Sequence, residues 1–306
     1  MYWIPTCILS ESGTRSKPSR SSRLSLNGKI QDVAGYVVKD CINKFYTDQE
    51  KDYLTKNLTF DYLTRNHSVF PENGKMVVKL PKDKTAGIER LLEDIENLYR
   101  EDDKEAIPTL HLANHLYSPV ASWRKGAKFQ EIKTVPVKLN QGETEFLEHL
   151  RVYLKSMETD FAGKEVFVLR NLSRRGVGFF IESSSFYPDF ILWVVEGNRQ
   201  RISFLDPKGI RNMGNFRDDK IVFCSTLIHD INASVQQKIA DENLAISVTL
   251  DAWLLSVTAY DTIKKQWGDD GATREDFLAN RVLFLDDTKA YLNVLLGLSQ
   301  PTGTLS

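Results

Sequence analysis

The sequence predicts an α/β protein with a mixed central sheet flanked by helices, preceded by a mainly helical N-terminal region. Three observations carry this prediction. Between residues 142 and 206 a helical pattern is followed by short apolar runs, the last two of which are joined by a Gly-Asn turn. A segment of helical period and a further strand-like run come next. Residues 85–101 carry apolar side chains at the three- and four-residue spacing of an amphipathic helix.

The composition is that of a globular protein of the cytoplasm. The chain has 306 residues, 42% of them hydrophobic, and a formal net charge of −1, which argues against a protein that coats nucleic acid without specificity. No apolar run has the length of a membrane helix or a secretory signal, so no membrane partner is expected. The three cysteines, at positions 7, 41 and 224, lack CxxC spacing, which favours a reducing compartment over a disulfide framework.

The N-terminal part divides into two predicted regions. Residues 1–30 include a Ser-rich, basic stretch without hydrophobic period, typical of a disordered arm. Residues 31–138 are predicted to be mainly helical, with a loose helical pattern over 33–66. His111 and His115 have the spacing of zinc-binding helices, but the expected glutamate between them is missing. We interpret these histidines as structural.

From residue 139 to residue 300 the pattern becomes regular and predicts one further domain. Its central part reads as a helix, several strands that form hairpins, a second helix and another strand. The predicted strands span 166–171, 176–183, 189–195, 201–206, 251–258 and 281–285. The predicted helices span 142–158, about 223–239, a short segment between the last two strands, and a last segment around 291–296.

The hairpin of residues 186–209 carries the candidate chemistry. If its turn is centred on Gly197 and Asn198, counting back along both strands places Asp189 opposite Asp206. Opposed side chains in such a pair have Cβ atoms about 4.5–5.5 Å apart, so the two carboxylates repel unless they share a cation. Strand alternation puts Lys208 on the same face as Asp206. The first strand is apolar on both faces and is therefore predicted to be central. The alternative is an edge hairpin whose acids point into water.

A third acid is expected from the preceding helix. Glu143 shares the face of Phe146, Leu147 and Leu150 and so should point toward the sheet. Two alternatives stay open: in one, Glu143 only complements the helix dipole in the first turn, and in the other, Glu182 is the competing carboxylate.

Such a group suits phosphodiester hydrolysis. Asp189 and Asp206, with Glu143 and the backbone carbonyl of Pro207, would bind Mg²⁺, or Mn²⁺ in its place, which polarises a phosphate and activates water. Lys208 would orient or deprotonate that water, or neutralise charge developing on the phosphate.

These residues carry a resemblance to a known family. Pro188-Asp189 followed by Asp206-Pro207-Lys208 is similar to the motif of the PD-(D/E)xK nucleases. The segments HLYSPV, LNQGETEF, LRNLSRRGVGFF, SFYPDFILW, FLDPKGI and DAWLLSVT together resemble the C-terminal nuclease region of type III restriction subunits and related DEAD/DEAH helicase-nuclease defence proteins. The resemblance covers about 110–300. It implies a restriction-endonuclease-like core, double-stranded DNA as substrate and Mg²⁺ as cofactor. The motor that precedes the nuclease in that family is missing from this chain.

The resemblance also shapes the expected partners. Arg174 and Arg175 beside Gly176, and Arg211, are the expected contacts to the DNA backbone, although the loop arginines would equally suit a solvated surface. A separate helicase or ATPase and a methyltransferase or specificity subunit are the expected protein partners. The rival function is a non-catalytic DNA-binding or assembly module, a remnant of a longer helicase-nuclease.

Overall fold

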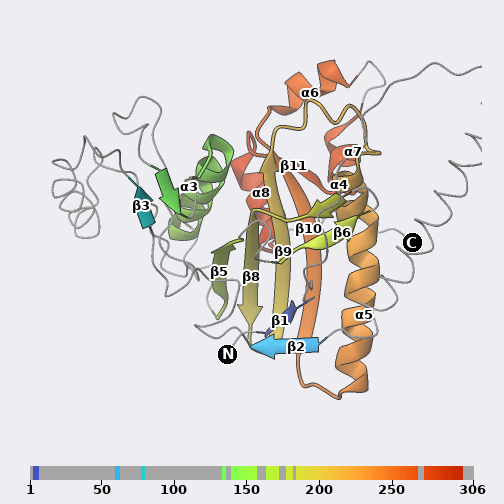
Figure 1. Cartoon of the computed structure of the whole chain (residues 1–306). Coiled ribbons are helices and arrows are strands. Elements are labelled where there is room, and N and C mark those ends of the chain that lie inside the picture. Colours follow the sequence, from blue (N-terminus) through green and yellow to red (C-terminus); the bar gives the residue numbers. More distant parts are fainter. Residues whose placement is uncertain are drawn as a thin grey trace, which may run out of the picture. The chain divides into compact units, whose positions relative to one another are not determined.

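A computed structural model describes parts of the chain, and these parts belong to two units, Met1–Leu63 and Thr64–Ser306 (Figure 1). The described residues are 3–6, 59–62, 77–79, 133–135, 139–156, 163–171, 177–181, 184–267 and 272–298. The predicted helix at 85–101, the two histidines of the HLANH segment and most of the predicted arm lie outside them.

In the first unit, β1 (Trp3–Thr6) pairs with β2 (Thr59–Tyr62) in an antiparallel two-stranded sheet. Both strands fall in ranges that the sequence assigned to the arm and to a loose helical pattern. The helical prediction is wrong for Thr59–Tyr62. Threonine, phenylalanine and tyrosine there favour an extended strand over a helix.

The second unit is α/β, with a five-stranded mixed sheet in the order β11-β10-β9-β8-β5. β8 is antiparallel to both of its neighbours, β5 and β9, while β9, β10 and β11 run parallel to one another. The strands are β5 (Glu165–Arg170), β8 (Phe190–Glu196), β9 (Arg199–Lys208), β10 (Ser247–Ser256) and β11 (Val282–Phe284). The predicted mixed sheet is thereby confirmed.

Helices precede, connect and follow these strands. They are α3 (Gln141–Ser156), α4 (Asp219–Val222), the π-helical turn η4 (Phe223–Leu227), α5 (Ile228–Asp241), α6 (Tyr260–Gln266), α7 (Arg274–Ala279) and α8 (Thr288–Leu295). α4, η4 and α5 follow one another without a break and correspond to the helix predicted for 223–239, which begins four residues earlier than expected. None of the helices in the described residues has the length and apolar character that crossing a bilayer requires.

Two short strand pairs lie outside the five-stranded sheet. β3 (Val77–Lys79) pairs with β4 (Lys133–Val135), and β6 (Phe179–Ile181) pairs with β7 (Ser184–Phe186), both antiparallel. The strand predicted at 176–183 therefore exists as β6 but does not join the central sheet.

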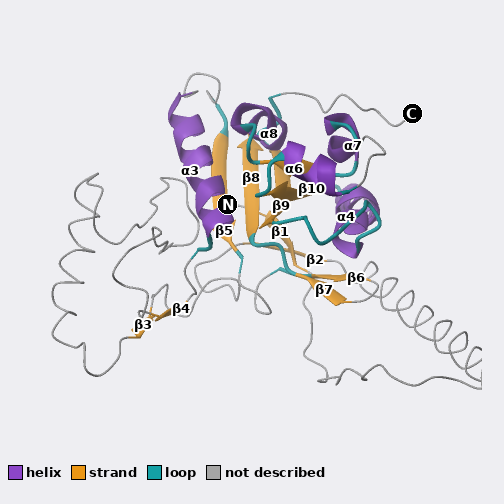
Figure 2. Cartoon of the chain, turned by 90° about the horizontal axis from the view of Figure 1, so that it is seen from above, coloured by secondary structure: helices purple, strands orange, loops and turns teal. Residues whose placement is uncertain are grey.

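The strand β8 is central, as its apolar sequence predicts, and every one of its residues before Glu196 is buried. Its even-numbered residues Phe190, Leu192 and Val194 pack in one hydrophobic cluster with α3 and α8. Its odd-numbered residues face the opposite side, where α5 packs against β10. Figure 2 shows α8 beside α3 and α4 away from both. The sheet is thus covered by different helices on its two faces.

The register of β8 with β9 is the one predicted from the turn. Phe190 pairs with Leu205 and Glu196 pairs with Arg199, with Gly197 and Asn198 between the strands. Gly197 has a φ of 60°. A positive φ at the first of two turn residues is typical of a type II′ hairpin turn, where glycine is favoured. This short turn therefore fixes which residues meet at the far end of the hairpin.

Pro207 in β9 has no N–H, but it lies beyond the last residue of β9 that pairs with β8. No hydrogen bond of the sheet is therefore lost there. The backbone carbonyl of Lys208 accepts a hydrogen bond from the N–H of Val257, next to β10. Successive backbone groups point to opposite edges of a strand, so the backbone of Pro207 faces the β8 side. The last β8 partner on that side is Phe190, which pairs with Leu205. The Pro207 carbonyl is therefore left outside the β8–β9 ladder.

Replacing Gly197 by alanine should destabilise the protein by about 1–2 kcal/mol, because an L-residue is strained at this positive φ. Chemical denaturation would measure the change. Gly209→Ala is the matched control, since its added Cβ would meet only ordinary contacts at 3.9 and 4.0 Å and its φ is not in the positive range. An equal loss in both variants would contradict the assigned turn.

Candidate active site

Two aspartates meet at the end of the sheet where β9 stops and β8 starts. Asp206, near the C-terminal end of β9, is 4% exposed. Asp189 directly precedes β8, one residue beyond the last β8–β9 pair, and its side chain shares a hydrogen bond with that of Asp206. The predicted opposition of the two acids is therefore realised, with Asp189 in a bend and not in the strand itself.

The bend that presents Asp189 is held by Asn171. The Asn171 side-chain amide donates hydrogen bonds to the carbonyls of Pro188 (2.8 Å) and Val177 (2.7 Å), and its backbone N–H donates to the carbonyl of Asp189 (2.8 Å). Its side-chain oxygen accepts from the Val177 N–H at 2.9 Å. Because Asn171 is buried, these bonds fix the chain direction before β8.

Burial and the neighbouring acids raise the pKa of Asp189 to about 8, from an ordinary value of 3.8. Desolvation is the largest cause, followed by the charge and the hydrogen bond of Asp206 and by the charge of Glu143, while Lys220 acts in the opposite direction. Two close carboxylates in a partly buried setting either retain a proton or need a cation. The negative potential at the Asp189–Asp206 pair is therefore of the kind that favours binding of a cation.

Among the described residues, Lys220 in the first turn of α4 is the cation that contacts Asp206. Its Nζ lies 2.5 Å from Oδ2 of Asp206 and 4.9 Å from the ring centroid of Phe186. The sequence prediction did not select Lys220, because it lies in a different element, beyond a long loop. The signal available was a short one: Asp218 followed by Asp219 and Lys220 has the residue types of a helix start.

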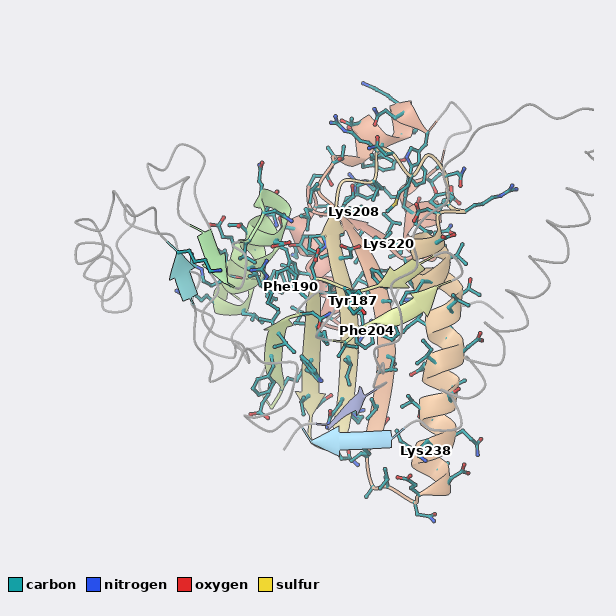
Figure 3. The ribbon with its side chains drawn as sticks, viewed as in Figure 1. Tyr187, Phe190, Phe204, Lys208, Lys220 and Lys238 are labelled. Carbon is teal, nitrogen blue, oxygen red and sulfur yellow. The ribbon has the colours of Figure 1, made fainter. Side chains whose placement is uncertain are left out.

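Lys208 lies at the same end of the sheet as Lys220, far from Lys238 of α5 (Figure 3). It is the last residue of β9, on the same face as Asp206, and its side chain is exposed. Among the described residues its ammonium has no ion pair. The predicted position of Lys208 on the hairpin therefore holds, while the ion pair with Asp206 is made by Lys220.

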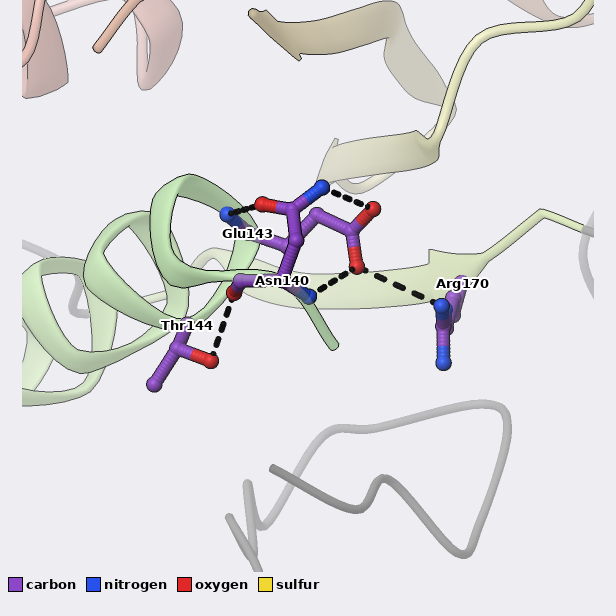
Figure 4. A network of polar contacts seen from close by, with 4 residues as sticks. All are labelled: Asn140, Glu143, Thr144 and Arg170. Atoms are coloured by element: carbon purple, nitrogen blue, oxygen red, sulfur yellow. Dashed lines mark hydrogen bonds and ion pairs between the residues drawn. The ribbon is translucent and has the colours of Figure 1, made fainter. Parts of the chain in front are cut away.

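Glu143 is buried in the first turn of α3 and is held by its own helix start (Figure 4). Its carboxylate accepts hydrogen bonds from the backbone N–H (3.1 Å) and side-chain amide (2.7 Å) of Asn140, and Asn140 Oδ1 accepts from the Glu143 N–H at 2.9 Å. Arg170 Nη2 lies 3.3 Å from the same carboxylate. These contacts form a reciprocal cap of the kind that stabilises helix N-termini.

Glu143 and the aspartates approach from different faces of the sheet. α3 packs on the face of Phe190 and Leu205, whereas Asp206 shares the face of Phe204 by strand alternation. Burial raises the pKa of Glu143, with Asp206 contributing in the same direction, and Arg170 opposes this rise. Glu143 thus acts on the aspartate pair through its charge. Its own carboxylate oxygens are already engaged by Asn140 and Arg170.

The donor set fits a hard divalent cation in part. Among the described residues, no three or more acidic, histidine or cysteine side chains are close enough together to hold a metal ion. Mg²⁺ is commonly bound through one or two carboxylates and retains several waters. Asp189, Asp206 and the Pro207 carbonyl supply oxygen donors of that kind. The competing acid Glu182 lies outside the described residues.

The expected DNA contacts are placed unevenly. Arg211 is exposed in the turn directly after β9, at the site end of the strand. Arg174 and Arg175 lie outside the described residues.

Comparisons of the chain with protein-family models, with curated proteins and with solved structures find no match.

The metal-free protein should lose stability as the pH rises from about 4 to about 8. The unfolded chain releases the Asp189 proton near 3.8, whereas the folded chain retains it to about 8, so the folded state is favoured at low pH and this contribution disappears above 8. Asp189→Asn should remove this dependence and be more stable than the wild type at pH 8. Urea unfolding at several pH values in the presence of EDTA would measure it.

Asp261→Asn, in the exposed first turn of α6, is the control and should retain the wild-type pH profile. A wild-type profile in Asp189→Asn would show that Asp189 ionises in the folded state as it does in the unfolded chain.

Proposed function

We propose that the chain is a Mg²⁺-dependent nuclease that hydrolyses phosphodiester bonds of double-stranded DNA. The observation that carries this proposal is the Asp189–Asp206 pair at the C-terminal end of β9, with Lys208 and Lys220 beside it. Asp206 is buried and Asp189 is half-buried, and two carboxyl groups in contact in such a setting either retain a proton or bind a cation. Hard oxygen donors beside lysines suit a metal ion and a phosphate together.

The fold supports a PD-(D/E)xK core as the finer assignment. A helix, α3, leads into antiparallel strands β5, β8 and β9, and a helical connection returns the chain to β10, parallel to β9. Pro188-Asp189 precedes β8, and Asp206-Pro207-Lys208 ends β9. The motif residues thus stand together at one end of a mixed sheet, and this arrangement supports the proposed assignment.

Each residue has a defined part in the proposed mechanism. Asp189 and Asp206, with the Pro207 carbonyl, would hold the Mg²⁺, which when bound polarises the phosphate and lowers the pKa of a bound water. Lys208, exposed and without an ion pair among the described residues, would orient the attacking water or neutralise charge developing on the phosphate. Glu143 would act through its charge, because Asn140 and Arg170 occupy its oxygens.

The second candidate function is a DNA-binding or assembly module without catalysis. The engaged carboxylate of Glu143 and the ion pair of Asp206 with Lys220 favour it, since both acids already have partners. In either case the proposed partners are duplex DNA, a separate helicase or ATPase, and a methyltransferase or specificity subunit.

Cleavage of duplex DNA in Mg²⁺ or Mn²⁺ should fall at least about a hundredfold in Asp206→Asn and in Lys208→Gln, because each removes a group that acts on the reacting phosphate. Gel assays of the full chain, alone and with any helicase or methyltransferase that is encoded beside it, would measure the rates. Lys238→Gln, at the far end of α5 (Figure 3), is the control and should cleave at the wild-type rate.

Cleavage that survives both substitutions would contradict the nuclease assignment. If the wild type fails to cleave DNA with every metal and partner tested, while Asp206→Asn binds DNA with full affinity, the non-catalytic module is the correct function.

Arg211→Ala should weaken duplex binding and lower the slope of log affinity against log salt by about one, since one phosphate contact is lost. Arg199→Ala is the matched control. Arg199 is also exposed, but it begins β9 at the opposite end of the strand, where it pairs with Glu196 at 3.0 Å. Fluorescence anisotropy at several salt concentrations would measure both, and equal effects would exclude this face as the DNA contact.

A further inference from the structure

Lys220 is a second lysine of the candidate site, in addition to the one in the Asp-Pro-Lys motif. Its side chain is 27% exposed, and that of Asp206 is 6% exposed. The 2.5 Å separation of Nζ and Oδ2 is that of a close charge-assisted hydrogen bond. The ammonium therefore lies against the carboxylate that would hold the proposed Mg²⁺.

The helix start places Lys220 there. The Asp218 side chain caps α4 by accepting a hydrogen bond from the Lys220 N–H at 3.0 Å. The π-helical turn η4 follows at once, anchored by the buried residues Phe223 and Cys224. A π turn adds one residue to the helix, and each α-helical residue turns the chain by about 100°. The π turn therefore rotates the side chains of α4 about the helix axis relative to the face by which α5 covers the sheet.

Aromatic packing fixes η4 in this position. The Phe223 ring lies 4.7 Å from the ring centroid of Phe179 and 5.1 Å from that of Phe186. Phe186 is also the ring over which the Lys220 ammonium lies. The Lys220 side chain thus packs along the ring of Phe186 before its ammonium contacts Asp206. This packing distinguishes it from a lysine on an exposed surface.

We propose that Lys220 competes with the divalent cation for Asp206 and turns to the DNA phosphate when the metal binds. This inference rests on the proposed nuclease function. Before metal binding, the ammonium holds the Asp206 carboxylate in place and offsets its charge. A divalent cation on the same carboxylate repels the ammonium, whose flexible stem allows it to reach an anion at the exposed side of the site.

Lys220→Gln should bind Mn²⁺ at least about fivefold more tightly than the wild type, since the competing charge is gone. Its DNA cleavage should fall at least about tenfold, since the phosphate contact is lost. Isothermal titration calorimetry of the full chain with MnCl₂ would measure the affinity without any cleavage.

Lys208→Gln is the matched comparison for affinity, because it removes the same charge at the same end of the sheet without breaking an ion pair to Asp206. Its gain in Mn²⁺ affinity should be smaller than that of Lys220→Gln. Lys220→Arg retains the ion pair, so its affinity should not exceed that of the wild type. It also tests the proposal if the glutamine variant does not fold, because an Arg variant that binds Mn²⁺ more tightly than the wild type would overturn it.

The outcomes separate this inference from the proposed function. If the wild type binds Mn²⁺ and Asp206→Asn does not, but Lys220→Gln binds with unchanged or weaker affinity, Lys220 is only a structural partner of Asp206 and the inference fails alone. If Asp206→Asn binds Mn²⁺ as the wild type does, or the wild type binds none, the proposed metal site itself is wrong.

Discussion

The pairing of β8 with β9 is the constraint on which the candidate site depends. The turn at Gly197 and Asn198 sets a register that ends with Asp189 and Asp206 side by side, where burial removes the water that would screen them. The surrounding contacts offset this cost or make it possible. Lys220 supplies a positive charge to Asp206, and Asn171 holds the bend that keeps Asp189 in position although its neighbour repels it.

The two faces of the sheet divide the acids between two environments. On the α3 side, Glu143 has a complete set of partners in Asn140 and Arg170. On the α5 side, Asp189 shares a hydrogen bond with Asp206, and Asp206 forms an ion pair with Lys220. The first arrangement stabilises a helix start, while the second retains a proton that a bound cation would displace. Strand alternation therefore separates a structural acid from the two candidate ligands.

The parts of the site that depend on local rules could be predicted from the sequence. A two-residue turn and the alternation of side chains suffice to oppose Asp189 to Asp206, and an apolar run suffices to make β8 central. Lys220 could not be reached in this way, because its position depends on a loop and on a π turn fixed by aromatic packing across the fold. Glu143 carried its own signal: Asn140 and Glu143 have the spacing of a reciprocal helix cap, which predicts that its oxygens are occupied.

A third buried acid shows how the fold balances charge where no ligand is expected. Asp251 in β10 is contacted by Arg201 at 2.6 Å and by Arg281 at 3.6 Å, so one carboxylate has two cations. At the candidate site two carboxylates have one cation among the described residues. A buried acid that serves stability alone is expected to be fully paired, as Asp251 is. One of the two carboxyl groups there instead retains its proton up to a pH of about 8. A divalent cation that displaces this proton would explain why Asp189 stands beside Asp206 without an arginine of its own.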